Sequence, residues 1–152
     1  AGPHRCEFVT EIEGVRFVND SKATNVHALC SALRAMPGGD SPKNIWLIAG
    51  GQDKRLDFHA AGPEIAKRVK GAFLMGEARE QIRAAWALFS PCELVANLVE
   101  ALAEARRKAV PGDVVLLSPA CASFDMFDSY EHRGRAFCQL LAEQGADART
   151  GV

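Results

Sequence analysis

Side chains that could hold a small anion gather in three polar segments, at residues 19–25, 50–58 and 118–127. Each segment follows a short run that predicts a β-strand. The groups suited to negatively charged oxygen atoms are two ammonium groups and four hydroxyls, on Lys22, Lys54, Ser21, Thr24, Ser118 and Ser123. Such groups, with free backbone N–H groups, bind carboxylates and phosphates. The segments therefore predict a site for a small dicarboxylate or a phosphorylated ligand rather than for an apolar one.

Each of these loops also has an explanation that needs no ligand, and the residues alone leave both explanations open. Asp20, Ser21 and Thr24 could cap the helix that follows them. Gly50-Gly51 could provide only a tight exit from a strand. Cys121 is small enough for core packing, and no histidine is placed nearby in the sequence to activate it as a nucleophile.

Two phosphate-binding signatures are missing from the sequence. There is no G-x-x-x-x-G-K-[ST] motif, so the chain has no P-loop for a nucleoside triphosphate. There is also no G-x-G-x-x-G motif after a predicted strand, which disfavours a nucleotide-binding oxidoreductase. Any phosphate chemistry must therefore use a phosphate site outside this chain.

The runs around the loops predict strands that alternate with helices. Extended runs are expected at residues 6–12, 15–18, 44–49, 72–75 and 114–117, and helices at 25–36, 63–69, 77–88, 94–108 and 130–144. The first two runs flank Glu13-Gly14 and predict a hairpin. The first turn of the last helix, at residues 131–133, could be exposed. Alternation of this kind predicts an α/β fold with three layers, in which helices cover both faces of a mostly parallel sheet with one antiparallel strand. Because parallel strands end at one edge, the three loops should meet there.

Length and composition limit the partners of this chain. Its 152 residues suit one domain over residues 1–152, without an internal boundary or repeat. A net charge of −1 gives no basic surplus for nucleic acid, and no apolar run reaches the roughly 20 residues that span a bilayer. We interpret Ala1–Arg5, which lacks an apolar signal core, as part of a linker.

The cysteines and histidines show no metal-binding pattern. The cysteine count of five is odd, the spacing is wide, and no C-x-x-C motif occurs. We therefore expect reduced, mostly buried thiols in a cytoplasmic protein. We also expect no metal held by this chain alone, since the four histidines have no ligand spacing.

The three loops, in this order and spacing, resemble the C-terminal domain of the Mur ligases, and in particular of the members that add D-glutamate. Residues 19–25 and 117–127 carry the closest resemblance. Residues 3–6 resemble the family's junction between the central and C-terminal domains. The resemblance covers about residues 3–143 and implies a Rossmann-like C-terminal domain that binds the incoming amino acid.

The family's enzymes have three domains, and the resemblance implies that two of them are absent from this chain. An N-terminal domain would hold UDP-N-acetylmuramoyl-L-alanine, and a central domain would hold ATP and magnesium through a P-loop. ATP would phosphorylate the alanine carboxylate, and the amine of D-glutamate would attack the acyl phosphate to form an amide. The implied function is peptidoglycan precursor synthesis in the cytoplasm, by a ligase whose isolated C-terminal domain is inactive.

Five residues correspond to positions beside D-glutamate in the family. Lys22, Thr24, Lys54 and Ser123 match residues that contact this substrate, and Tyr130 stands where a phenylalanine is common. Two ammonium groups and two hydroxyls suit a ligand with two carboxylates. The resemblance assigns no catalytic residue and no metal ligand within the chain.

Arg5 and Asp20 correspond to positions that face the nucleotide when the family's C-terminal domain closes. Gln52 and Asp53 depart from the pattern of the second loop. An alternative hypothesis is a non-catalytic module that binds a small anion or an acidic metabolite. It would need the same loops but no partner domains, so an upstream P-loop domain in the same protein distinguishes the two hypotheses.

Overall fold

The fold is an α/β sandwich, described by a computed structural model over residues 2–37 and 43–149. The strands are β1 (Glu7–Ile12), β2 (Val15–Asn19), β3 (Ile45–Gly50), β4 (Val69–Met75), β5 (Cys92–Leu94) and β6 (Val114–Leu117). The helices are α1 (Val26–Ala35), the 3-10 helix η1 (Phe58–Ala61), α2 (Gly62–Arg68), α3 (Arg79–Trp86), α4 (Leu98–Lys108) and α5 (Tyr130–Arg149).

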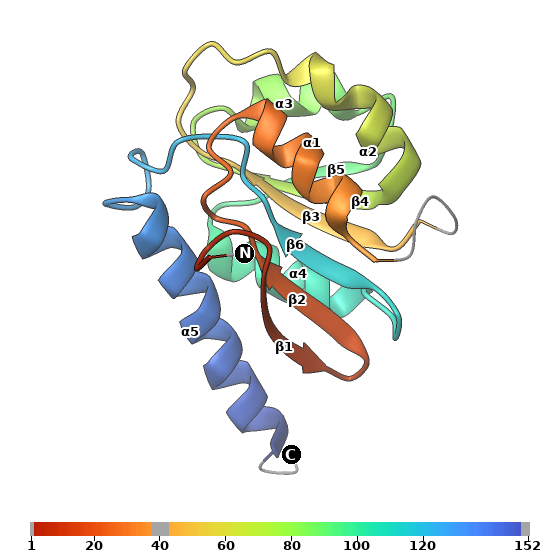
Figure 1. The fold of residues 1–152 in the computed structure, drawn as a ribbon, viewed down its shortest axis with the longest axis vertical. Helices are drawn as coiled ribbons and strands as arrows, with labels where there is room; N and C mark the ends of the chain where they lie inside the picture. The colour runs from red at the N-terminus through yellow and green to blue at the C-terminus, as the bar shows by residue number, and fades with distance from the viewer. Residues whose placement is uncertain (1, 38–42, 150–152) are drawn as a thin grey trace.

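One six-stranded sheet runs in the order β1-β2-β6-β3-β4-β5 (Figure 1). Strand β1 pairs antiparallel with β2, and every other neighbouring pair in the sheet is parallel. Helices α1, α2 and α3 contribute to the core on one face, and α4 and α5 contribute to the core on the other. The predicted three-layer α/β fold with one antiparallel strand is therefore confirmed.

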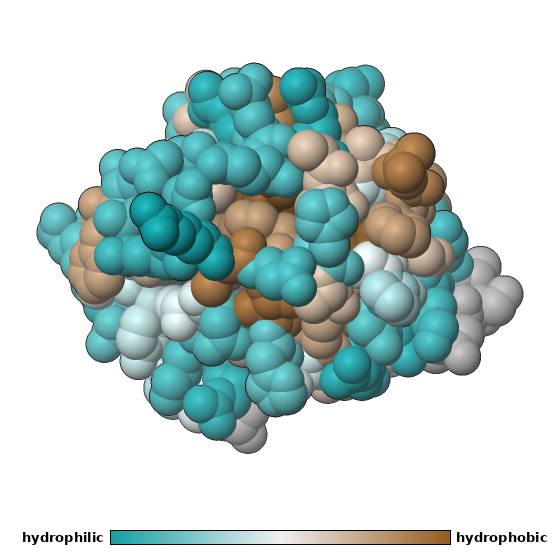
Figure 2. Space-filling model, turned by 90° about the horizontal axis from the view of Figure 1, so that it is seen from above, coloured by the Kyte–Doolittle hydropathy of each residue, from teal (hydrophilic) through white to brown (hydrophobic). Residues whose placement is uncertain are grey.

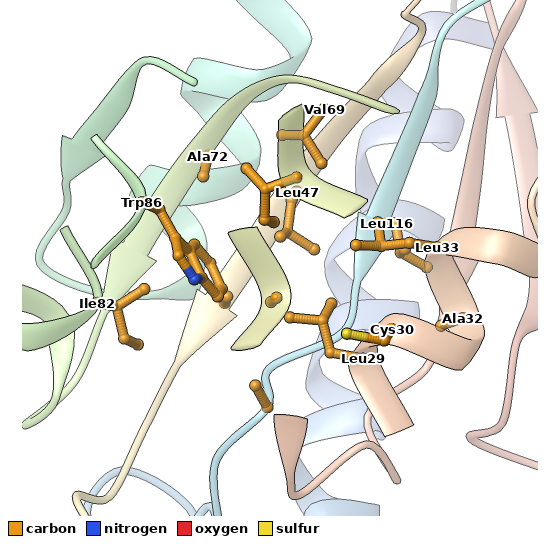
Figure 3. Close-up of a cluster of buried hydrophobic side chains, with 14 of the residues drawn as sticks. Leu29, Cys30, Ala32, Leu33, Leu47, Val69, Ala72, Ile82, Trp86 and Leu116 are labelled. Carbon is orange, nitrogen blue, oxygen red and sulfur yellow. The ribbon is translucent and has the colours of Figure 1, made fainter. Parts of the chain in front are cut away.

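The sheet is buried on both faces, which explains the continuous apolar runs of its central strands. Neighbouring residues of β3 point to opposite sides, so Leu47 belongs to the core under α1 and Ile48 to the core under α4 and α5. Figure 3 shows the first of these cores, in which Leu33 of α1 lies near Leu116 of β6. This packing holds the central strands in register.

The region before α4 differs from the prediction. Leu94 and Val95 fit the helical spacing of the residues that follow, and we expected them in the helix. Instead, residues 92–94 form an edge strand, and the helix begins only at Leu98. Asn97 sets this boundary, because its side chain accepts a hydrogen bond from Glu100 N at 2.9 Å and caps the helix. Strand β4 also begins at Val69, earlier than expected, directly after α2.

The end of β3 requires glycine. Gly50 has φ +116°, and a Cβ atom there would clash with the carbonyl oxygen of Met75 on β4. Gly51 has φ +153°, and a Cβ atom there would clash with the carbonyl oxygen of Ala122. The interpretation of Gly50-Gly51 as a tight strand exit is therefore confirmed, and the exit also lets neighbouring loops approach closely.

We expect Gly50→Ala to destabilise the fold by about 3 kcal/mol, because it adds a steric clash to an unfavourable positive φ. Gly112→Ala is the matched control, since Gly112 has φ +97° but a Cβ atom added there would meet no atom within 4 Å. The control should cost only about 1–2 kcal/mol. Urea unfolding of the two variants measures the difference, and equal midpoints would contradict the proposed clash.

Candidate functional site

The three polar loops meet at one edge of the sheet. They follow β2, β6 and β3, which are neighbours in the sheet and mutually parallel, so their carboxyl ends lie side by side (Figure 1). The predicted convergence is therefore confirmed. This edge is the usual ligand-binding position of an open α/β sheet.

Backbone hydrogen bonds join the second and third loops. Gly50 N donates to Pro119 O at 3.0 Å, and Gln52 N donates to Ala122 O at 2.9 Å. Gln52 and Ala122 also form an isolated antiparallel bridge. Since Lys54 follows Gln52 by two residues and Ser123 follows Ala122 directly, these contacts hold the two loops that carry Lys54 and Ser123 against each other.

Arg133, in the first turn of α5, joins the first and third loops. Its Nε donates to Ser21 Oγ at 2.9 Å and its Nη2 to Ser21 O at 2.7 Å, while Nη1 donates to Cys121 O at 3.0 Å. Ser21 Oγ in turn donates to Tyr130 O at 2.7 Å. Arg133 is only 1% exposed, so the expectation that this helical turn could lie open to solvent is wrong for this side chain. Burial lowers the pKa of its guanidinium to about 10.

Asp20 and Ser118 form a second buried connection between the first and third loops. The Asp20 carboxylate accepts a hydrogen bond from Ser118 Oγ at 2.7 Å and another from Cys6 N at 3.0 Å. Burial raises the pKa of Asp20. The idea that Asp20 caps helix α1 is wrong, because Asn25 is the cap and accepts from Ala28 N at 2.8 Å.

The N-terminal segment lies against the first loop and α5. Lys22 N donates to His4 O at 2.9 Å, and the buried Asn19 amide donates to His4 Nδ1 at 2.9 Å. The His4 ring meets the Tyr130 ring edge-on, with centroids 6.1 Å apart. Gly134 permits this approach, since a side chain there would clash with His4. Sequence reasoning placed Asn19 and His4 in segments of interest without predicting their contact, and it did not identify Gly134.

Two adjoining cavities open beside this segment. One, of about 490 Å³, is lined by Gly2, Pro3, His4, Arg5, Lys22, Tyr130 and Glu131. The other, of about 480 Å³, lies towards α1, and its lining includes Arg5, Asp20 and Lys22. Arg5 and Lys22 line both cavities. The structure therefore brings Lys22 together with Tyr130, and Arg5 together with Asp20.

The remaining candidates lie outside the linings of these two cavities. Lys54 is exposed, Thr24 is half-buried, and Ser123 is only 2% exposed. Among the described residues, no side chain or backbone group forms a hydrogen bond with the Ser123 hydroxyl, although the Ser123 carbonyl accepts from Met126 N and Phe127 N. Thr24, Lys54 and Ser123, all among the described residues, thus lie on three loops at the same edge of the sheet, but their side chains form no hydrogen bond with one another.

Gln52, one of the two departures from the family pattern, has a buried side-chain oxygen. Its Oε1 has no hydrogen-bond partner among the described residues. Its neighbour Asp53 accepts a hydrogen bond from Gln81 Nε2 at 2.7 Å. The second loop is therefore tied to α3 as well as to the third loop.

The thiol of Cys121 is unsuited to nucleophilic chemistry. It is fully buried, and burial raises its pKa to about 12, so the thiolate is scarce near neutral pH. Its interpretation as a core residue is confirmed, and all five cysteines are free. Over residues 2–37 and 43–149, no cluster of three or more His, Cys, Asp or Glu residues could hold a metal ion. Within the same residues, no helix is both long and apolar enough to cross a bilayer.

The surface seen from above in Figure 2 is mostly hydrophilic. Hydrophobic side chains show at the bottom of a central hollow, and hydrophilic residues form its rim. A surface of this kind gives a charged ligand polar contacts at the rim and partial shelter from water below it.

Comparison with solved structures supports the fold. The chain superposes on a bifunctional folylpolyglutamate synthase/dihydrofolate synthase from Yersinia pestis, solved with AMPPNP and manganese, with a TM-score of 0.65 and 16% identity. That match covers 92% of this chain and 32% of the other. A domain from a putative UDP-N-acetylmuramate:L-alanyl-gamma-D-glutamyl-medo-diaminopimelate ligase of Haemophilus ducreyi gives a TM-score of 0.59 at 14% identity, over 76% of this chain and 88% of that one.

Curated sequences are much more similar. The chain is 47% identical over 139 residues to a UDP-N-acetylmuramoylalanine--D-glutamate ligase from Bdellovibrio bacteriovorus, and 49% identical over 146 residues to one from Acidobacterium capsulatum. These matches cover 91% and 95% of this chain but only 29% and 31% of the relatives, so the chain spans less than a third of their length. The family model for the Mur ligase, glutamate ligase domain matches residues 4–121. The chain therefore belongs to the Mur ligase family, within its glutamate ligase domain.

Proposed function

We propose that this chain is the C-terminal, acceptor-binding domain of a cytoplasmic ATP-dependent ligase that joins D-glutamate to UDP-N-acetylmuramoyl-L-alanine. The names of the relatives support this substrate pair. The observation that carries the proposal is the meeting of three polar loops at the carboxyl ends of β2, β6 and β3. The chain's short span relative to its relatives supports further domains that hold the other substrates.

In this proposal the site recognises the two carboxylates of D-glutamate. Lys22 and Lys54 supply ammonium groups from different loops, and Thr24 and Ser123 supply hydroxyls. Tyr130 forms a side wall of the cavity that Lys22 also lines. Charge-assisted hydrogen bonds to both carboxylates would orient the amine, because a ligand held at two ends has little freedom to rotate.

The reaction first exchanges one P–O bond for another, and then forms one C–N bond while one C–O bond breaks. The alanine carboxylate accepts the terminal phosphoryl group of ATP, which releases ADP and gives an acyl phosphate. The D-glutamate amine then attacks the carbonyl carbon, loses a proton, and displaces inorganic phosphate. This domain positions the amine, and Arg5 and Asp20 line the groove that would face the nucleotide on closure. By the family resemblance, magnesium would be held in the central domain.

A non-catalytic anion-binding module would share these loops, but its relatives would not be expected to be ligases. The deciding experiment is a phosphate-release assay on the full-length protein. UDP-N-acetylmuramoyl-L-alanine and ATP are supplied with D-glutamate, L-glutamate, D-aspartate or L-alanine in turn. Release that depends on D-glutamate supports the proposal, and release with none of these acceptors contradicts it.

Lys22→Ala in the full-length enzyme should lower kcat/KM for D-glutamate strongly, because one substrate carboxylate loses its partner. A loss of about 2–5 kcal/mol corresponds to roughly 30-fold to several-thousand-fold in kcat/KM. Lys67→Ala is the control, since Lys67 is an exposed lysine of α2, just before the amino end of β4. Near-normal turnover of Lys22→Ala at low D-glutamate would refute the role of Lys22.

The isolated domain should bind D-glutamate only weakly, because much of the site forms when the domains close. Isothermal titration calorimetry of residues 1–152 with D-glutamate measures this affinity, with D-glutamine as a ligand that keeps one carboxylate. Submicromolar binding by the isolated domain would show that the site is complete without closure.

A further inference from the structure

Arg133 is an unusual residue of this edge because a charged side chain is almost completely buried there. Charged residues are rarely buried to this extent unless an opposite charge accompanies them. Arg133 is 1% exposed, yet none of the ion pairs formed by the described residues includes it. Its three hydrogen bonds go to a hydroxyl and two carbonyl oxygens, all of them neutral.

The guanidinium nevertheless keeps its charge near neutral pH. Burial lowers its pKa to about 10, which leaves it protonated at pH 7. Asp125 attracts it from beyond ion-pair distance, and the Cys121 thiol beside it is neutral because burial raises the pKa of that thiol to about 12. A positive charge without a paired carboxylate is therefore hydrogen-bonded to both loops that carry Lys22 and Ser123.

The hydrogen bonds of Arg133 also reach the backbone next to both candidate side chains. Nη2 binds the carbonyl of Ser21, the residue before Lys22, and Nη1 binds the carbonyl of Cys121, two residues before Ser123. A flat, rigid guanidinium fixes the spacing and angle of these two carbonyls. A lysine has three N–H donors on a single nitrogen atom, so it cannot reproduce contacts that Nε, Nη1 and Nη2 make from three separate positions.

We propose that Arg133 is a positioning residue of the acceptor site, which sets the spacing between the Lys22 and Ser123 loops and whose unpaired positive charge attracts the dicarboxylate acceptor. This inference rests on the proposed function and deepens it. Arg133 does not touch the substrate in this account; it acts through the two loops and through its field. A dicarboxylate benefits from such a field because it brings negative charge to a partly dehydrated edge.

The test compares Arg133→Lys with Arg133→Gln in the full-length enzyme. Both variants lose the three-contact geometry, but only the lysine variant keeps the charge. We expect kcat to fall in both by about tenfold to a hundredfold. The KM for D-glutamate should rise by about tenfold or more in the glutamine variant and by less than about threefold in the lysine variant. The KM values for ATP and for the nucleotide-linked substrate should stay within about twofold.

A purely structural role gives a different result. Equal KM values for D-glutamate in the two variants would overturn the claim that the positive charge of Arg133 attracts the acceptor. A joint rise of all three KM values, together with a lower melting temperature, would overturn the positioning role. If either Arg133 variant fails to fold, Ser21→Ala replaces it as the test variant. This substitution removes the hydroxyl contact of Arg133 but keeps its charge and its two contacts with carbonyls. It should lower kcat about fivefold without changing the KM for ATP, and an unchanged kcat would also overturn the proposal.

Failure of this inference can be told apart from failure of the proposed function. If the wild-type enzyme does not use D-glutamate in the phosphate-release assay, the proposed function fails before any variant is measured. If the wild-type enzyme uses D-glutamate and the two Arg133 variants behave alike, only the role of Arg133 fails.

Discussion

Buried polar backbone groups at the ends of three parallel strands are the constraint on which this edge of the molecule depends. Strands β2, β6 and β3 end side by side. Where the chain leaves each strand, its buried N–H and C=O groups still need hydrogen-bond partners. The structure meets this need with contacts between loops as well as with bonds within them, such as those from Met126 N and Phe127 N to Ser123 O. The Arg133 guanidinium donates to carbonyls of two loops, and the Asp20 carboxylate accepts from Ser118 and from the N-terminal segment. The backbone N–H of Gln52 donates to the Ala122 carbonyl.

These contacts connect stability with recognition. The residues that hold the loops together are neighbours in the sequence of the residues that we assign to the ligand. Ser21, whose hydroxyl and carbonyl bind Arg133, precedes Lys22, and Ala122, whose carbonyl accepts from Gln52 N, precedes Ser123. The cores on both faces of the sheet fix the strands, and the strands fix where these pairs can lie. A rigid scaffold of this kind suits a site that must orient an amine for attack.

Local sequence patterns predicted the layers and the meeting of the loops, because burial on both faces leaves apolar runs such as Ile45–Gly50 and Val114–Leu117. The same patterns could not predict that Arg133 is buried, since its partners lie 112 and 12 residues away in the chain. The contact between Asn19 and His4 was hidden for the same reason. The pattern wrongly placed Leu94 in helix α4, because the helical spacing of apolar residues extends to positions before Asn97, the residue that caps the start of the helix.

The segment around His4 and Cys6 has a mechanical consequence. Its backbone is bonded to Asp20 at one residue and to Lys22 at another, and Arg5 between them borders both cavities. Any polypeptide attached before this segment would therefore act directly on a residue that lines both cavities. If that polypeptide changed its orientation, Arg5 would move with it, and the shapes of both cavities would change together.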